Sequence, residues 1–227
     1  RAMRNDATPP RRLDSDRVLI SSQGDMQLRQ LTFLRFVAAS GVVVFHYGTH
    51  TPSLALAEPL WRYANSAVSF FFFLSGFILT HVYWQRQVSR FDFYVARAAR
   101  ILPLYALALM AAALFHLKQG TLRWDQLALN VLLIQAWVPG HSQSINSAGW
   151  SLSVEACFYL AFPLLLAAIA RVRETASLIG LAIGSWILNG LLHVALVDAA
   201  RANSAVTSLD DFSVYHPLTH LATFVAG

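Results

Sequence analysis

Long apolar stretches alternate with short polar segments along most of this chain. The stretches lie at about 31–47, 61–84, 101–117, 150–170 and 176–197, and a last one begins at Pro217. An apolar run of about 17 to 25 residues is long enough for a helix to cross a bilayer. The pattern therefore predicts an all-α fold, a polytopic bundle of about five to six transmembrane helices.

One apolar segment, residues 126–138 (QLALNVLLIQAWV), is short for a span. It could be a thin span, a re-entrant piece or a helix that lies in the membrane interface. Arginine placement favours no full crossing, because Lys and Arg gather in cytoplasmic loops. Without that crossing, the arginine-rich N-terminal segment, residues 86–100 and the turn with Arg171 and Arg173 all fall on the cytoplasmic side. We therefore expect a multi-pass protein of the inner (plasma) membrane with a cytoplasmic N-terminus.

The two ends of the chain contrast in polarity. Residues 1–27 are polar and carry no apolar run, so we expect a disordered tail without a signal peptide. Met26 is a candidate for the natural start. The membrane domain then occupies residues 28–227, and its last apolar run stops after 11 residues. Because this last apolar run is too short for a span, we expect that the membrane domain is partial and that the chain is a fragment of a longer protein.

Composition supports the membrane interpretation. The chain is 56% hydrophobic and 13% charged, whereas a soluble domain carries about 25% charged residues. The net charge is +5, and most of the basic residues lie in the polar segments outside the apolar spans. This placement indicates a lipid bilayer as partner and no nucleic acid. The lone Cys157 excludes a disulfide within the chain. His216 and His220 are four residues apart but have no acidic third ligand beside them, so we predict no metal and no bound cofactor.

Arg35 and His46 lie within the first predicted span, eleven residues apart. Eleven residues make about three helical turns, so both side chains project from nearly one face, roughly 16 Å apart along the axis. Ionisable residues inside a span are costly and indicate function. A neutral His46 could act as a general base. The alternative is that Arg35 reaches the cytoplasmic interface and His46 lies in the outer one.

Two further pairs stand out in the next spans. Ser75 and Gly76 are small and would let a helix or a ligand approach closely. Arg97 and Arg100 are three residues apart and would share a helix face, where two guanidinium groups can grip phosphates. The alternative for Ser75 and Gly76 is that they serve close helix packing alone. The alternative for Arg97 and Arg100 is that they are ordinary positive charges on the cytoplasmic side.

Glu155 lies about one turn into the span that begins at Trp150. A carboxylate at that depth needs a partner. An arginine could pair with it, or it could orient His46. The alternative is a carboxylate that stays in the interface.

Several motifs occur together in a fixed order: LRQLTFLRFVAASGVVVFHY, FFFLSGFILT, FYVARAARILPLY and WSLSVEACFYLAFPLLL. With these motifs the chain resembles the membrane-bound acyltransferase-3 family, which includes O-antigen and other glycan O-acetyltransferases. The resemblance runs from about Leu28 to the C-terminus. Members of that family usually have more spans than this chain.

The resemblance implies transfer of an acyl group, often acetyl from acetyl-CoA, to a hydroxyl of a sugar or similar acceptor. It implies that His46 is the catalytic base, that Arg35 is its functional partner, and that Arg97 and Arg100 meet the acyl-CoA phosphates. Glu155 belongs to a motif of the active cavity. We predict catalytic roles for His46 and Glu155, and substrate contacts for Arg35, Ser75, Arg97, Arg100 and Trp150.

The resemblance favours a polysaccharide-modifying O-acetyltransferase, in which acyl-CoA is a donor substrate and no cofactor is resident. Two other functions stay open. A proton-coupled transporter or flippase would use Arg35, His46 and Glu155 as a relay. An inactive, truncated family member would keep the motifs without the activity.

Overall fold

The computed structural model describes residues 30, 31, 33–43, 66–84, 86, 88–202 and 207–227. Two compact units are present, Arg1–Ala67 and Val68–Gly227. In the first unit, the apolar helix Phe33–Val43 covers part of the first predicted span. Arg35 is on this helix, whereas His46 and the predicted tail at 1–27 lie outside the described residues.

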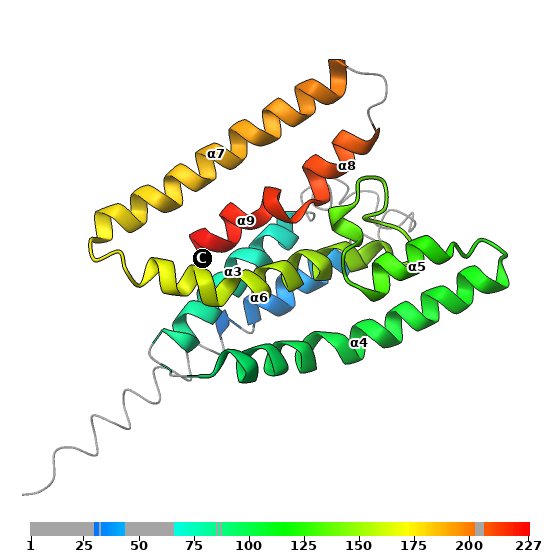
Figure 1. Cartoon of the computed structure of the whole chain (residues 1–227), viewed down its shortest axis with the longest axis horizontal. Helices are drawn as coiled ribbons and strands as arrows, with labels where there is room; N and C mark the ends of the chain where they lie inside the picture. Colours follow the sequence, from blue (N-terminus) through cyan, green and yellow to red (C-terminus); the bar gives the residue numbers. More distant parts are fainter. Residues whose placement is uncertain (1–29, 32, 44–65, 85, 87, 203–206) are drawn as a thin grey trace, which may run out of the picture. The chain divides into compact units, whose positions relative to one another are not determined.

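The second unit is built from helices (Figure 1). In chain order they are α3 (Ser66–Tyr83), α4 (Arg90–Lys118), α5 (Trp124–Val131), α6 (Trp150–Ile169), α7 (Thr175–Ala202), α8 (Thr207–Tyr215) and α9 (Pro217–Ala226). Two short 3-10 helices, η2 (Gln135–Trp137) and η3 (Ser147–Gly149), lie between α5 and α6. The described residues contain no strand, which confirms the all-α class.

Three helical stretches in the described part of the chain are long and apolar enough to cross a membrane: Arg90–Lys118, Ser147–Ile169 and Thr175–Ala199. Their outward side chains suit contact with lipid, since Leu104 is 74% exposed and Trp186 is 68% exposed. The helices Phe33–Val43 and Ala67–Tyr83 are apolar but shorter. The count of five to six spans therefore stays a prediction.

Helix α4 begins earlier than its apolar run. Ser89 caps it, because the Ser89 hydroxyl accepts a hydrogen bond from the Asp92 backbone N–H at 3.1 Å. The polar residues up to Arg100, expected to precede the span, are consequently helical. Pro103 consequently lies inside the helix. This correction places Arg97 and Arg100 about two and three turns into α4.

The segment 126–138 does not form one continuous helix. Helix α5 has 8 residues, about 12 Å at 1.5 Å per residue, against about 30 Å for the hydrocarbon core. Leu133 then turns the chain with φ of 56°, and the Ser153 hydroxyl of α6 donates to its carbonyl at 2.6 Å. This geometry agrees with the expectation that the segment makes no full crossing.

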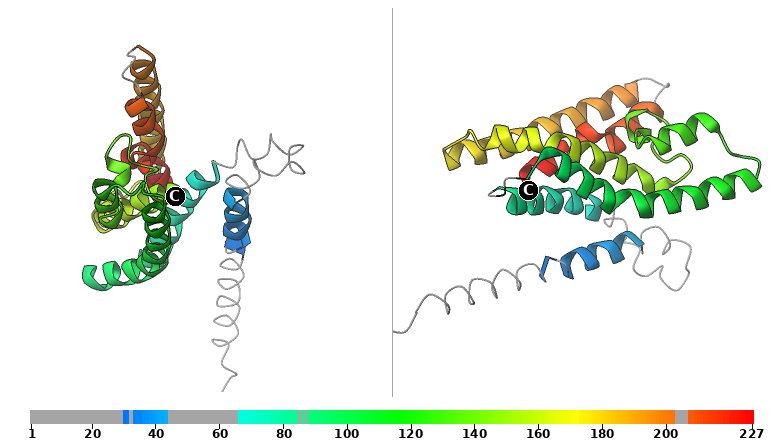
Figure 2. Two further views of the ribbon diagram at one scale, coloured as in Figure 1. Left: turned by 90° about the vertical axis from the view of Figure 1, so that its right-hand side faces the viewer. Right: turned by 60° about the horizontal axis from the view of Figure 1, so that its bottom comes forward.

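A buried polar network holds the folded segment between α5 and α6 in place. The Tyr105 hydroxyl of α4 donates to the Asn130 carbonyl at 2.7 Å. The Gln135 side-chain amide donates to the Gly149 carbonyl at 2.9 Å. Buried polar groups are tolerated when they are bonded in this way. Figure 2 shows the segment folded back beside the end of α4.

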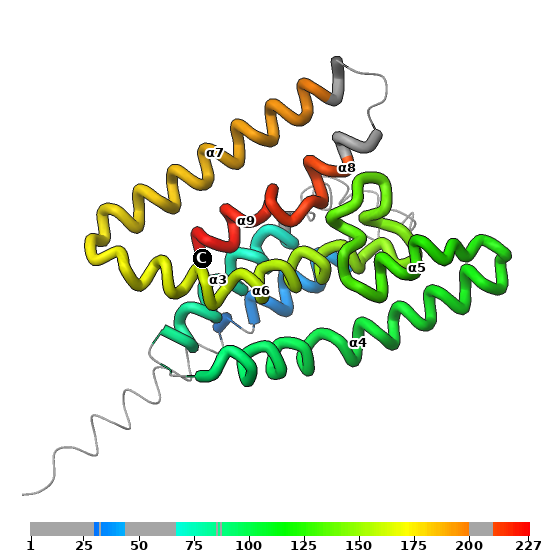
Figure 3. Tube along the Cα trace, viewed as in Figure 1, coloured from blue at the N-terminus to red at the C-terminus, as the bar shows by residue number. Residues whose placement is uncertain are grey.

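Helix α6 lies at the centre of the second unit, with α4 and α9 packed against it. Val154 and Phe158 of α6 are fully buried, and the Phe158 ring stacks on Phe224 of α9 with centroids 4.6 Å apart. Helix α9 also runs beside α7 (Figure 3).

At Gly76 of α3 a Cβ atom would lie only 2.0 Å from the Phe224 carbonyl oxygen. The small residue at 76 thus serves close helix packing, the alternative weighed for this pair.

Candidate functional site

Two predicted site residues, Glu155 and Ser75, lie beside Tyr159 of α6. The Tyr159 side chain is 5% exposed, and its hydroxyl donates a hydrogen bond to the Glu155 carboxylate one turn earlier. The Ser75 hydroxyl of α3 is within hydrogen-bonding reach of the same Tyr159 hydroxyl, whereas the charge of the exposed Arg100 on α4 acts on it from a longer distance. The Tyr159 hydroxyl therefore links α6 to α3.

Arg97 of α4 lies against the same tyrosine from its ring side. The Arg97 guanidinium carbon is 5.9 Å from the Tyr83 and Phe93 ring centroids and 5.8 Å from that of Tyr159. A cation within about 6 Å of an aromatic face is stabilised by the electrons of the ring. These three rings partly replace the water that the charge loses among the helices.

The Arg97 Nε–H has no hydrogen-bond acceptor among the described residues, although the atom is buried. A buried donor without a partner costs about 1–3 kcal/mol, and more when the group is charged. The planar guanidinium of arginine suits carboxylate and phosphate oxygens. Arg97 therefore keeps a buried donor that no described residue uses.

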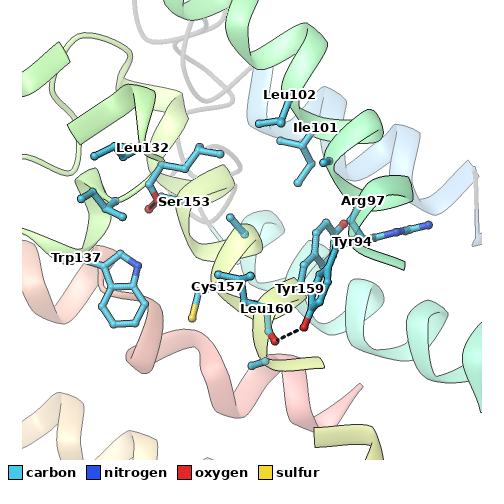
Figure 4. A pocket seen from close by; sticks show the side chains of 15 residues that line it. Tyr94, Arg97, Ile101, Leu102, Leu132, Trp137, Ser153, Cys157, Tyr159 and Leu160 are labelled. Carbon is cyan, nitrogen blue, oxygen red and sulfur yellow. Dashed lines mark hydrogen bonds between the residues drawn. The ribbon is translucent and has the colours of Figure 1, made fainter. Parts of the chain in front are cut away.

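A cavity of about 710 Å³ lies beside Arg97, between α4, α6 and the turn after α5 (Figure 4). Ile101 and Leu102 line it from α4, and Ser153 and Cys157 from α6. The walls are mostly apolar, and the remaining members include Tyr94, Leu132, Trp137, Tyr159 and Leu160. In Figure 4, Arg97 and Tyr159 lie together at one side of this space. The walls of this space suit a slender, largely apolar group, and in Figure 4 the nitrogen end of Arg97 points away from the other labelled lining residues.

The structure places Trp150 differently from the residues around Tyr159. Trp150 is 6% exposed, and its ring packs edge-on against Phe72 at 6.2 Å and Tyr215 at 4.9 Å. It is absent from the cavity lining. Its described neighbours give it a packing role, and its predicted substrate contact stays a prediction.

The predicted pair in the first unit is described only in part. Arg35 is half-buried on its helix and has an interaction partner. His46 lies outside the described residues. The catalytic role of His46 and the supporting role of Arg35 therefore rest on the sequence.

His216 has a structural role in the turn between α8 and α9. Its ring stacks on Phe212 with centroids 3.9 Å apart, and its Nδ1 accepts a hydrogen bond from the Leu218 backbone N–H at 3.3 Å, which caps α9. Burial lowers the pKa of His216 below its ordinary value of 6.5. A neutral imidazole is the form that can accept this bond.

Sequence reasoning missed the aromatic residues of the site: Tyr83, Phe93 and Tyr159. Tyr159 could have been found, because it is four residues after Glu155 and side chains at that spacing meet on a helix. Tyr83 and Phe93 carried no such signal, since they look like ordinary residues of a membrane interface.

Residues 28–210 match the Acyltransferase domain family. The chain belongs to this acyltransferase family. It is 35% identical over 155 residues to Acyltransferase MdmB of Streptomyces mycarofaciens, a match that covers 61% of this chain and 39% of that protein. It is 26% identical over 211 residues to Nodulation protein 10 of Rhizobium leguminosarum bv. viciae, covering 80% of this chain and 56% of that protein.

The chain thus spans between about two fifths and three fifths of the length of these relatives. No solved structure matches it significantly. The family match confirms the resemblance that the motifs had indicated.

Proposed function

We propose that the full-length protein is a membrane O-acyltransferase that moves an acyl group, acetyl first among the candidates, from acyl-CoA to a hydroxyl of a carbohydrate or similar acceptor. Membership of the acyltransferase family supports the reaction class. The observation that carries the donor assignment is the half-buried Arg97, which borders an apolar cavity and whose buried Nε–H lacks an acceptor among the described residues.

Coenzyme A has properties that suit this combination of charge and apolar wall. Its phosphates are anions that guanidinium groups bind through paired, charge-assisted hydrogen bonds. Arg97 and Arg100 supply two such groups on one helix. The pantetheine arm and its thioester are slender, and the cavity of about 710 Å³ beside Arg97 is large enough for them. In this proposal the phosphates contact the arginines and the arm occupies the cavity.

The chemistry is a direct transfer in a ternary complex. The acceptor oxygen attacks the thioester carbonyl, so a C–O bond forms as the C–S bond breaks. His46 takes the proton from the acceptor hydroxyl and the departing thiolate of CoA gains one. Arg35 stabilises negative charge that develops on the donor. Glu155 keeps its proposed catalytic role, and Ser75 and Trp150 complete the proposed substrate contacts.

The test of the donor site is acyl transfer from labelled acetyl-CoA in membranes that contain the full-length protein. Replacing Arg97 by Gln removes the charge, and we expect the KM for acetyl-CoA to rise at least tenfold. Arg100→Ala should also raise it. The matched control is Arg171→Gln, an exposed arginine in the turn after α6, which should leave the KM within twofold. An unchanged KM in Arg97→Gln and Arg100→Ala would refute the phosphate assignment.

The base is tested separately. His46→Ala should abolish transfer while the protein still inserts into the membrane. Retained transfer would contradict the assignment of His46. A protein that moves a substrate across the membrane without consuming any CoA thioester would instead be a transporter.

A further inference from the structure

We propose that Tyr159 is the positioning residue of this acyltransferase site. Its hydroxyl holds the Glu155 carboxylate, while its ring holds the Arg97 guanidinium, so one side chain fixes the acidic and the basic group relative to each other. The inference rests on the proposed function and extends it to a residue for which the motifs gave no role.

The geometry divides the side chain into two working parts. The hydroxyl donates to Glu155 within α6 and lies near Ser75 of α3. The ring face lies 5.8 Å from the Arg97 guanidinium carbon. Because Tyr159 is 5% exposed and borders the cavity, both contacts are shielded from bulk water at the place where the donor is proposed to bind.

Core packing alone does not account for the hydroxyl. Phe158 and Phe162 are neighbours of Tyr159 on α6 and are buried to a similar degree without one. Tyr159 belongs to the same apolar cluster, so a phenylalanine would satisfy the packing there. A buried hydroxyl must find a partner or it costs free energy. Its partner here is a predicted catalytic residue, which points to a task beyond packing.

Electrostatics gives the reason for the arrangement. A carboxylate and a guanidinium inside a helix bundle would attract each other strongly, because charges interact more strongly at low dielectric. Direct contact between Glu155 and Arg97 would consume the donors that a phosphate needs. By taking Glu155 with its hydroxyl and Arg97 with its ring, Tyr159 keeps both groups in place and leaves the guanidinium N–H groups for the ligand.

The experiment compares Tyr159→Phe and Tyr159→Leu in the full-length protein, using transfer from labelled acetyl-CoA. Tyr159→Phe removes only the hydroxyl, so we expect kcat to fall about tenfold with the KM for acetyl-CoA within twofold of wild type. Tyr159→Leu also removes the ring, so the KM should rise as well. Tyr105→Phe is the matched control, since it too removes a buried hydroxyl, bonded to the Asn130 carbonyl at 2.7 Å. Its kinetic constants per folded enzyme should stay near wild type.

A double-mutant cycle with Glu155→Gln identifies the partner. If the hydroxyl acts through Glu155, Tyr159→Phe should change kcat less than twofold in the Glu155→Gln background. Equal tenfold effects in both backgrounds would overturn the proposal, and so would wild-type kinetics in Tyr159→Phe. If the wild-type protein transfers no acyl group from CoA thioesters, the proposed function fails and this role fails with it. Transfer that is normal in Tyr159→Phe but lost in His46→Ala removes the role of Tyr159 and leaves the function standing.

Discussion

Replacement of Gly76 by Ala probes a close contact between α3 and α9. A Cβ atom at Gly76 would lie 2.0 Å from the Phe224 carbonyl oxygen and 3.1 Å from its carbonyl carbon. Real Cβ atoms keep at least 3.0 Å, so α3 and α9 must separate by about 1 Å (3.0 minus 2.0). The obstacle is backbone, which cannot rotate away as a side chain would. Overpacking of this kind costs about 1–3 kcal/mol.

For a unit of this size, we expect the thermal unfolding midpoint of Gly76→Ala in detergent to fall by roughly 3–10 °C. The matched control is Gly184→Ala on α7, where an added Cβ has no neighbour within 4 Å. Alanine also favours helix over glycine by about 0.5–1 kcal/mol, so this control should be neutral or slightly stabilising. A midpoint for Gly76→Ala equal to that of Gly184→Ala would refute the close packing of α3 on α9.

Three further changes test the parts of the fold that support the site. The low pKa of the buried His216 means that its contribution to stability is present above about pH 6.5 and is lost as the pH falls below that value. His216→Asn keeps a capping acceptor but does not titrate in this range. The unfolding midpoint of this variant should therefore drop less than that of wild type between pH 7.5 and 5.5. An equal drop in both proteins would contradict the role of His216. Asp211→Asn weakens the 2.5 Å bond from the Ser142 hydroxyl and should speed proteolysis of the 139–146 loop, whereas an unchanged cleavage rate would count against that tie. Tyr105→Phe should lower the unfolding midpoint by a few degrees, because a buried hydrogen bond contributes about 1 kcal/mol, and no change would argue against the network.

Hydrophobic length was enough to predict the helical class, because a span needs a run of apolar residues of known length. It was not enough to place the start of α4. Residues 90–100 (RFDFYVARAAR) mix four charged residues with apolar ones, too many charges for a span, and the start depends on the local cap at Ser89. Arg97 was therefore expected at the membrane edge, whereas the structure places it among the aromatic rings of three helices.

The residues around Tyr159 could be predicted singly but not as a group. Ser75, Arg100 and Glu155 are on three different helices, and no sequence spacing relates helices that are joined by loops of variable length. Only Glu155 and Tyr159 share a helix, at a spacing that predicts contact. Trp150 shows the reverse case, since its motif suggested substrate contact while its described neighbours are packed aromatic rings.

The most direct test of the account is the KM for acetyl-CoA of the full-length protein in membranes, measured by transfer of labelled acetyl to endogenous acceptor, for wild type, Arg97→Gln and Arg171→Gln. The account predicts transfer by wild type, a KM at least tenfold higher in Arg97→Gln, and a KM within twofold in Arg171→Gln. Absence of transfer by wild type, or an unchanged KM in Arg97→Gln, would contradict it.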